Sequence, residues 1–290
     1  MKLQHLNKKR LILIDLDGTT LMNDGKTIHP KTQDVIKEAV KAGHKVCITT
    51  GRPHRASIRF YRELGLDTLL TNFDGGHIHD PLKREFKRLV FPISYDVIMS
   101  IINHPDVKNI VANVLIEHYD KAICWKKDEA IKNYFHLDDV ADDEYFIANP
   151  YTAWKGPASN MALYLNNTNE KDQILRIFEN FKNSVQVNIG HYNNSGQVQI
   201  MIMINITNKL VSKGFAANIL AQYYNVDIRD VIAFGDEMND LELLQNVGYG
   251  IAMKNGNDNL KTNARGITHL TNDEGGVGDY LQKLLKGENV

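Results

Sequence analysis

Ten consecutive residues near the start of the chain read Leu11-Ile12-Leu13-Ile14-Asp15-Leu16-Asp17-Gly18-Thr19-Thr20. Four apolar residues in a row predict a strand buried on both faces, as in a parallel sheet covered by helices. Asp15 and Asp17 are two residues apart, so their side chains point the same way in extended backbone. Gly18 permits a turn that a Cβ atom would hinder. The stretch therefore predicts a buried strand whose end presents two carboxylates to one small volume.

The carboxylate pair has three chemical interpretations: a metal site, an acid/base pair, or a nucleophile beside a proton donor. A surface turn without chemistry is the structural alternative. A calcium loop fits less well, because Leu16 stands between the acids and an apolar strand precedes them. The residues alone favour a catalytic role and leave the three chemical interpretations open.

The composition is that of an ordinary globular protein. The chain has 290 residues, of which 43% are apolar and 24% charged, enough for one large domain or two ordinary ones around a packed core. The formal net charge is −1 and the pI is about 6.8, so no general field favours nucleic acid or an anionic membrane. Cys47 and Cys124 are far apart in the sequence, so neither a disulfide framework nor a zinc ribbon is expected.

The N-terminal apolar run is too short for a signal peptide, and no stretch approaches membrane-spanning length. We therefore expect a cytoplasmic protein with no nucleic-acid or membrane partner. The expected assembly is a monomer or a weak homo-oligomer.

Helix and strand patterns alternate at both ends of the chain. At the N-terminal end they fall at residues 30–43, 45–49, 53–65 and 68–71, and at the C-terminal end at 210–224, 231–234, 241–245, 249–253, 266–270 and 277–285. This alternation predicts an α/β fold with a doubly wound, parallel, Rossmann-like core sheet. The intervening part reads as mixed helices and half-buried strands, which predicts an inserted α+β domain. We expect a discontinuous core of residues 1–90 and 195–290, with the insert at 91–194.

Polar clusters follow three of the predicted core strands. Asp15 and Asp17 follow the first, Thr50-Gly51 follows the second, and Asp236 with Asn239 and Asp240 follows a later one. Ligands of open α/β sheets gather outside the carboxyl ends of the strands. Three clusters at strand ends therefore predict one site at this edge of the sheet.

Four motifs stand in order along the chain: Asp15-Leu16-Asp17-Gly18-Thr19, Thr50-Gly51-Arg52, Lys213-Gly214 and Gly235-Asp236-x-x-Asn239-Asp240. In this order and spacing, the chain resembles the haloacid dehalogenase-like hydrolase superfamily, in its Cof-type sugar-phosphatase branch. The resemblance covers essentially the whole chain and implies a cap domain inserted between the second and third motifs. It also implies a phosphoric monoester hydrolase that acts on small phosphorylated metabolites, sugar phosphates first among them.

The resemblance implies catalytic roles for the two acids of the first motif. Asp15 would be the nucleophile that forms an aspartyl-phosphate, and Asp17 would protonate the leaving group and then take a proton from the attacking water. Mg²⁺ would be held by Asp15, the backbone carbonyl of Asp17, and Asp236. Asp240 would support the site by orienting magnesium waters.

The other motif residues would bind the substrate phosphate: Leu16, Thr50, Gly51, Lys213 and Asn239. Thr50 would use its hydroxyl, Gly51 its backbone N–H, Lys213 its charge and Asn239 its amide. Without the resemblance, Thr50 and Asn239 read as caps of the helices that follow them, and Lys213 as a solvated helical lysine.

One position departs from the family pattern. Members usually carry Asn-Gly after the third strand, whereas Asp74-Gly75 stands there in this chain. His77 and His79 follow it at a spacing that puts them on one face, but no third metal ligand is placed by spacing, so they read as hairpin residues. The roles of Asp74 and of the two histidines stay open.

Two other functions remain possible at this point. A phosphomutase or other phosphotransferase would use the same Asp15 but pass the phosphoryl group to an acceptor other than water. A non-catalytic binding module would keep the fold without needing the acids. The sequence does not name the physiological substrate, because no motif in the insert is diagnostic.

Overall fold

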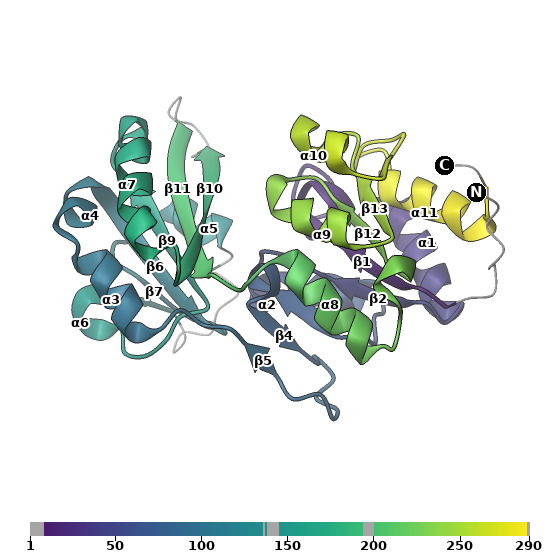
Figure 1. Cartoon of the computed structure of the whole chain (residues 1–290), viewed down its shortest axis with the longest axis horizontal. Coiled ribbons are helices and arrows are strands. Elements are labelled where there is room, and N and C mark those ends of the chain that lie inside the picture. The colour runs from purple at the N-terminus through teal and green to yellow at the C-terminus, as the bar shows by residue number, and fades with distance from the viewer. Residues whose placement is uncertain (1–8, 136, 138–144, 194–199, 289–290) are drawn as a thin grey trace. The chain divides into compact units, whose positions relative to one another are not determined.

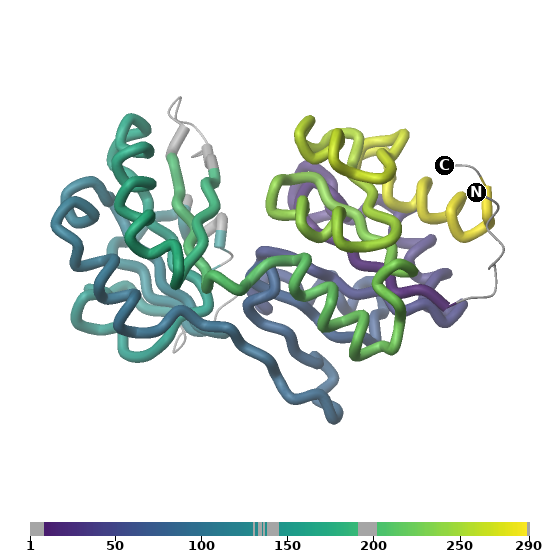
Figure 2. Tube along the Cα trace, viewed as in Figure 1, coloured from purple at the N-terminus to yellow at the C-terminus, as the bar shows by residue number. Residues whose placement is uncertain are grey.

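The computed structural model describes residues 9–135, 137, 145–193 and 200–288, which form two compact units (Figure 1). The first unit comprises Met1–Gly51, Ser57–Arg88 and Ser212–Val290, and the second comprises Arg52–Ala56 and Leu89–Val211. The colouring along the trace in Figure 2 shows the discontinuity: the purple start and the yellow end of the chain belong to one unit.

A five-stranded sheet in the order β14-β13-β12-β1-β2 forms the centre of the first unit, and all its pairs are parallel. Its strands are β1 (Leu11–Ile14), β2 (Lys45–Ile48), β12 (Ile232–Gly235), β13 (Tyr249–Ala252) and β14 (Gly266–Ile267). β1 lies between β2 and β12, and all four of its residues are fully buried. The uninterrupted apolar run is therefore explained by burial on both faces.

Helices cover both faces of this sheet (Figure 1). They are α1 (Pro30–Lys41), α2 (His54–Glu63), α8 (Lys213–Tyr223), α9 (Leu241–Asn246), α10 (Asp258–Asn263) and α11 (Gly276–Lys286). The first three residues of α2, 54–56, belong to the second unit, and the rest of this helix belongs to the first. Ile12 and Ile14 of β1 share a hydrophobic cluster with Ile36 of α1 and Leu281 of α11. On the other face, α8 packs against α9. Alternate residues of β1 therefore face different helical layers, which makes the core doubly wound as predicted.

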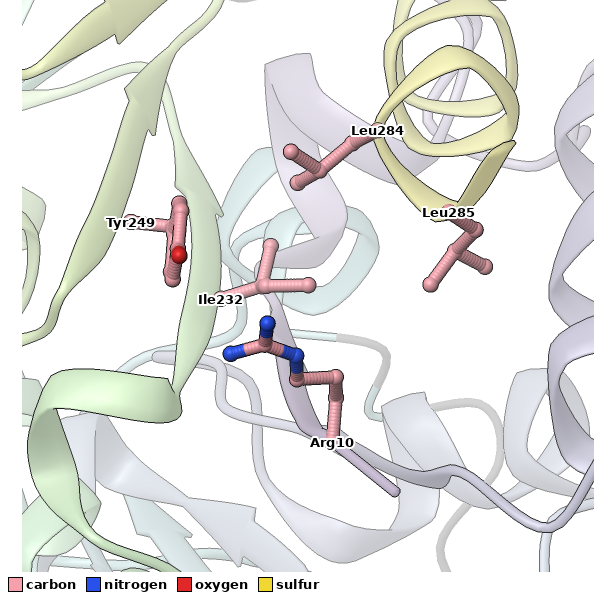
Figure 3. Close-up of a pocket in the computed structure, with 5 residues that line it drawn as sticks. All are labelled: Arg10, Ile232, Tyr249, Leu284 and Leu285. Atoms are coloured by element: carbon pink, nitrogen blue, oxygen red, sulfur yellow. The ribbon is translucent and has the colours of Figure 1, made fainter. Parts of the chain in front are cut away.

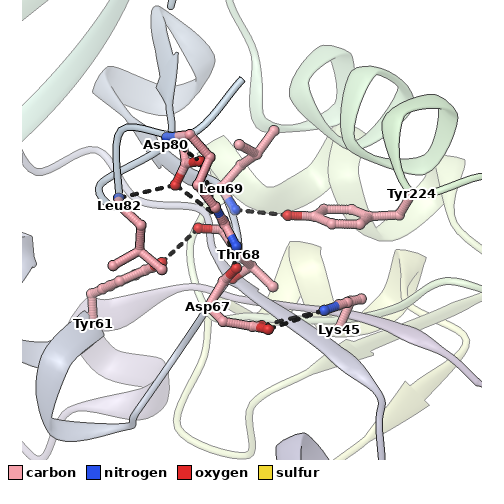
Figure 4. A network of polar contacts seen from close by, with 9 residues as sticks. Lys45, Tyr61, Asp67, Thr68, Leu69, Asp80, Leu82 and Tyr224 are labelled. Atoms are coloured by element: carbon pink, nitrogen blue, oxygen red, sulfur yellow. Dashed lines mark hydrogen bonds and ion pairs between the residues drawn. The ribbon is translucent and has the colours of Figure 1, made fainter. Parts of the chain in front are cut away.

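A short antiparallel pair extends the core beyond β2. β3 (Leu70–Asn72) joins β2 through the parallel bridge between Thr49 and Thr71 and then pairs with β4 (His77–His79). The residues before β3 are held from two sides (Figure 4): the Tyr224 hydroxyl accepts from the Leu69 N–H at 2.7 Å, and the Tyr61 hydroxyl donates to the Thr68 carbonyl at 2.8 Å. This bracing fixes the turn that follows β3.

The second unit is built on a six-stranded sheet in the order β10-β11-β9-β6-β7-β8. Its strands are β6 (Val111–His118), β7 (Lys121–Cys124), β8 (Tyr145–Ile147), β9 (Asn160–Leu165), β10 (Val185–Asn193) and β11 (Ile200–Asn208), and β5 (Leu89–Val90) precedes them. The helices are α3 (Tyr95–Asn103), α4 (Pro105–Ile110), α5 (Glu129–Tyr134), α6 (Pro150–Ala153) and α7 (Lys171–Phe178). Ile116 packs with α3, α4 and α7, whereas Leu115 packs with Ile131 of α5. The predicted α+β character follows from these two apolar faces.

The chain returns to the first unit later than the sequence predicts. β11 pairs with β9 and β10, so Ile200–Asn208 belongs to the second unit, and the first unit resumes at Ser212. The sequence prediction assigned this strand to the core because its apolar run resembles a core strand. The predicted boundary between residues 194 and 195 itself lies outside the described residues. α8 begins at Lys213, where the Ser212 side chain accepts from the Phe215 N–H, rather than at residue 210.

The amino ends of the core strands enclose a small cavity of about 20 Å³, lined by Arg10, Ile232, Tyr249, Leu284 and Leu285 (Figure 3). It has room for about one water molecule. Arg10 spans it, with a hydrogen bond to Asp230 at 2.9 Å and its guanidinium over the Tyr249 ring. Arg10 therefore leaves little free volume at this point of the edge. Within the described part of the chain, no helix has the length and apolar character needed to cross a membrane.

Candidate active site

The first motif leaves β1 through a tight turn, Leu16–Thr20, that brings its acids to the carboxyl edge of the sheet. The Thr20 hydroxyl donates to the Asp15 carbonyl at 2.6 Å. Gly18 has φ +64°, and a Cβ built on it would lie 2.0 Å from Oδ2 of Asp236. Only glycine therefore lets this turn approach Asp236 so closely. The Thr19 hydroxyl donates to Oδ1 of Asp236 at 2.9 Å, which joins the first and last motifs.

Asp240 holds the turn after β12 in shape. Its Oδ2 accepts from the backbone N–H groups of Asp236 at 3.0 Å and Glu237 at 3.2 Å. Its Oδ1 accepts from Nζ of Lys213 at 2.7 Å. The side chain is fully buried. Both carboxylate oxygens are thus engaged inside the protein, so Asp240 braces the turn that carries Asp236.

Lys213 is the buried cation of the site. Its side chain is 1% exposed, and Nζ lies 2.9 Å from Oδ1 of Asp15, 2.7 Å from Oδ1 of Asp240 and 3.8 Å from Oδ1 of Asp74. Ser212 caps the helix that begins with Lys213, which fixes the point from which the long side chain extends. The interpretation as a solvated helical lysine is therefore wrong.

The second motif and the turn after β3 lie side by side. The Asp74 N–H donates to the Thr50 carbonyl at 3.0 Å, and a Cβ on Gly51 would lie 3.2 Å from Oδ1 of Asp74. Nδ2 of Asn239 donates to the same Oδ1 at 3.0 Å. Asp74 thus links the second motif to the fourth.

Burial dominates the electrostatics of the acids. It raises the pKa of Asp15 well above its usual value, while the Lys213 charge opposes this and the neighbouring carboxylates add to it. Burial also raises the pKa of Asp74 and, helped by Asp240, that of Asp236 to about 7. Burial alone would lower the pKa of Lys213, but Asp15, Asp240 and Asp74 together raise it well above its usual value. The site holds more negative charge than its lysine can balance.

The carboxylates have the donor set of a hard divalent cation. One oxygen from each of Asp15, Asp236 and Asp240 lies within 4.8 Å of the other two. Oxygen-only ligands suit Mg²⁺. The residues therefore fit the ion, and since both oxygens of Asp240 are engaged, Asp15 and Asp236 are the better placed ligands.

The structure brings most of the predicted site residues together at one edge of the sheet. Asp17 differs from the other acids because its side chain is exposed. Asp15, Lys213, Asp236 and Asp240 form one buried cluster. Thr50, Gly51 and Asn239 adjoin it through Asp74, and Leu16 is buried in the turn after Asp15. Asp17 is exposed in the same turn, where solvent can reach it.

Sequence reasoning missed the contacts made by Thr19, Thr20 and Asp74. The threonines belong to the first motif, and the departure from the family pattern at residue 74 was a visible signal. His77 and His79 are buried with their rings stacked at 4.4 Å, and Nε2 of His79 lies 3.2 Å from Oδ1 of Asn72. Among the described residues, the metal-sized cluster of side chains is the aspartate group and includes neither histidine.

A family model described as haloacid dehalogenase-like hydrolase matches residues 12–281. The 5-amino-6-(5-phospho-D-ribitylamino)uracil phosphatase YitU of Bacillus subtilis is 31% identical over 287 residues, which cover 96% of this chain and 98% of that protein. A putative phosphatase of Metamycoplasma hominis is 28% identical, covering 94% of this chain and 96% of its own length. The solved structure of the subclass IIB sugar phosphatase BT4131 superimposes with a TM-score of 0.72 at 17% identity, covering 95% and 99% of the two chains.

Proposed function

The chain belongs to the haloacid dehalogenase-like hydrolase family, in its Cof-type branch, and on that premise we propose a Mg²⁺-dependent phosphatase of small phosphorylated metabolites. The observation that carries the proposal is the buried cluster in which Lys213 contacts Asp15 and Asp240 beside Asp236. Such an excess of buried carboxylates, at the carboxyl edge of a parallel sheet, suits a site completed by a cation and a phosphate.

In the first step, an Asp15 carboxylate oxygen attacks phosphorus, a new P–O bond forms and the ester P–O bond breaks. Asp17 donates its proton to the departing oxygen. In the second step, water attacks the aspartyl-phosphate, Asp17 takes the proton, and inorganic phosphate and free Asp15 result. The exposure of Asp17 supports this role, because its partners in proton transfer are a leaving group and a water molecule.

Asp15, the Asp17 carbonyl and Asp236 would hold Mg²⁺, with Asp240 as support. When bound, the ion neutralises the phosphoryl oxygens that otherwise repel the attacking carboxylate. The residues proposed to bind those oxygens are Leu16, Thr50, Gly51, Lys213 and Asn239. Thr19 keeps Asp236 in place through its hydrogen bond.

The substrate class we propose is the sugar phosphates and their close relatives. The support is the name of the Bacillus relative, whose substrate carries a phosphoribityl group. The second unit would act as the cap that discriminates among substrates. We further propose a cytoplasmic enzyme that is a monomer or a weak homo-oligomer.

The test is a screen of phosphorylated metabolites with Mg²⁺, ranked by kcat/KM, with release of inorganic phosphate as the readout. We expect hydrolysis that chelation removes and Mg²⁺ restores. Ca²⁺ should support it poorly, because its looser shell holds nucleophile and phosphate less well at the in-line distance. Full activity after exhaustive chelation would contradict the metal requirement. Phosphate transfer to an added alcohol or sugar without release would instead identify a phosphotransferase.

A further inference from the structure

Asp74 occupies the turn after β3 and takes no part in the two chemical steps. Its Oδ1 nevertheless lies among the residues proposed to bind phosphate: it accepts from Asn239 at 3.0 Å and lies 3.8 Å from Nζ of Lys213. The same oxygen is close to Gly51, and the Asp74 N–H donates to the Thr50 carbonyl. The side chain is 16% exposed. One carboxylate therefore occupies donors that the phosphoryl group also needs.

The negative charge of Asp74 has no role in the proposed reaction or in bracing a turn, unlike the charges of the neighbouring acids. Asp15 is the proposed nucleophile, and Asp240 holds the turn after β12 with Oδ2 while its Oδ1 accepts from Lys213. Asp74 adds a third carboxylate around Lys213. An asparagine would have nearly the same shape without the charge. What distinguishes aspartate from asparagine at this position is therefore its charge or its proton.

We propose that Asp74 competes with bound phosphate for Asn239 and Lys213, and so weakens the affinity of the site for inorganic phosphate. This inference rests on the proposed function. Inorganic phosphate and the phosphoryl group of a monoester are both strongly anionic, so an extra carboxylate beside the donors opposes the binding of either one. The consequence is an enzyme that releases phosphate readily and tolerates high phosphate concentrations.

Asp74 can be replaced in two ways without straining the turn. Its φ is +53°, a conformation that asparagine and glycine adopt more readily than other residues. Asp74→Asn keeps the shape and removes the charge, and Asp74→Gly removes the side chain entirely. If the charge competes with phosphate, both variants bind phosphate more tightly. If Asp74 is instead a protonated hydrogen-bond donor to phosphate, Asp74→Asn retains the affinity and Asp74→Gly loses it.

The experiment is a calorimetric titration of inorganic phosphate into each full-length protein in Mg²⁺, together with the inhibition constant of phosphate against a generic phosphoester. Charges about 4–5 Å apart in a partly screened site change a binding constant by about tenfold or more, so we expect Kd and Ki to fall by that factor in both variants. KM for the ester should fall with them, more than kcat changes. Asp80→Asn is the matched control, because Asp80 is also buried but pairs with Arg84 away from the site, at 2.7 Å.

Unchanged phosphate affinity in both variants, with folding verified by circular dichroism, would overturn the inference. The inference would also be overturned if Asp74→Asn retained the phosphate affinity and Asp74→Gly lost it, as expected of a proton donor. Wild-type protein that hydrolyses no phosphoester would refute the proposed function instead, and the calorimetric comparison of the three variants would still test Asp74.

Discussion

The two units each bury an ion cluster, and the clusters differ in charge balance. In the second unit, Arg55 pairs with Glu117, and both side chains are almost wholly buried. Arg55 also donates to the Phe135 carbonyl, and Asn160 donates to Glu117 at 3.0 Å. In the first unit, Lys213 faces three carboxylates, with Asp236 close by.

The difference separates structural from functional burial of charge. In the pair of Arg55 and Glu117, one positive charge neutralises one negative charge, and both groups make further hydrogen bonds within the fold. The Lys213 cluster instead retains an excess of carboxylates whose pKa values burial raises. A fold tolerates such an excess where a ligand removes it, so the unbalanced cluster marks the site.

The largest expected effect is that of Asp15→Asn. Turnover should fall by roughly 10⁴-fold or more, because an amide is not a competent nucleophile. The fold should persist, since Lys213 keeps Asp240 as a partner and the cluster loses one unbalanced charge. Phosphate release and thermal unfolding measure the two halves of this prediction. Substantial residual phosphatase activity in the Asp15→Asn variant would contradict the assignment of Asp15 as the nucleophile.

Breaking the ion pair between Arg55 and Glu117 should have the opposite effect: stability should fall, but hydrolysis should remain. Glu117→Ala leaves the Arg55 charge buried without its partner, which typically costs about 3–5 kcal/mol of unfolding free energy. Hydrolysis of a small generic ester by the folded fraction should remain. The control is the double variant Arg55→Met with Glu117→Leu, which should recover most of the stability. Chemical denaturation measures both, and a fully stable Glu117→Ala protein would show that the ion pair is dispensable.

The sequence predicted the core well because its signals are local. Four apolar residues before Asp15 indicate a doubly buried strand, and Pro30 near the start of a 3.6-residue pattern indicates α1. The prediction that the core resumes before β11 was wrong, because an apolar strand of the second unit resembles a core strand and pairing partners are not encoded locally. The motifs located the acids, but they did not show that Asp240 accepts from both Lys213 and the turn after β12, or that Asp74 contacts Asn239. Those contacts depend on how separate loops meet.

The unbalanced cluster should make metal-free stability depend on pH. The folded-state pKa of Asp236 is about 7, above its usual value of 3.8, so the folded protein holds a proton that the unfolded chain has lost between these values. Stability from this group is therefore lost as pH rises from about 4 to 7, by up to about 1.4 kcal/mol per pH unit. Because Mg²⁺ competes with that proton, it should raise Tm more at pH 8 than at pH 5.

Thermal unfolding with chelator and with Mg²⁺, from pH 5 to 8, measures this difference. Asp236→Asn is the control, because it removes the titrating group and a proposed ligand together. Its Tm should respond little to Mg²⁺ at any pH. An equal Mg²⁺ effect on wild type at both pH values would contradict the link between the buried acid and the ion.

The smallest expected effect is that of Thr19→Val, which tests how finely the cluster is arranged. Valine has nearly the shape of threonine but cannot donate to Asp236, so the carboxylate loses its 2.9 Å hydrogen bond. Loss of such an outer contact typically weakens metal affinity by roughly 10–100-fold, and the lost hydrogen bond costs about 1 kcal/mol of stability. Thr32→Val is the matched control: Thr32 is equally buried in the same unit and accepts from the Gly278 N–H at 3.3 Å, away from the acids. Both variants should lose similar stability, but only Thr19→Val should need more Mg²⁺ for half-maximal rate. If the two variants had the same Mg²⁺ requirement, the hydroxyl of Thr19 would contribute to folding alone. The position of Asp236 in the unbalanced cluster would then be set by the backbone and not by this hydrogen bond.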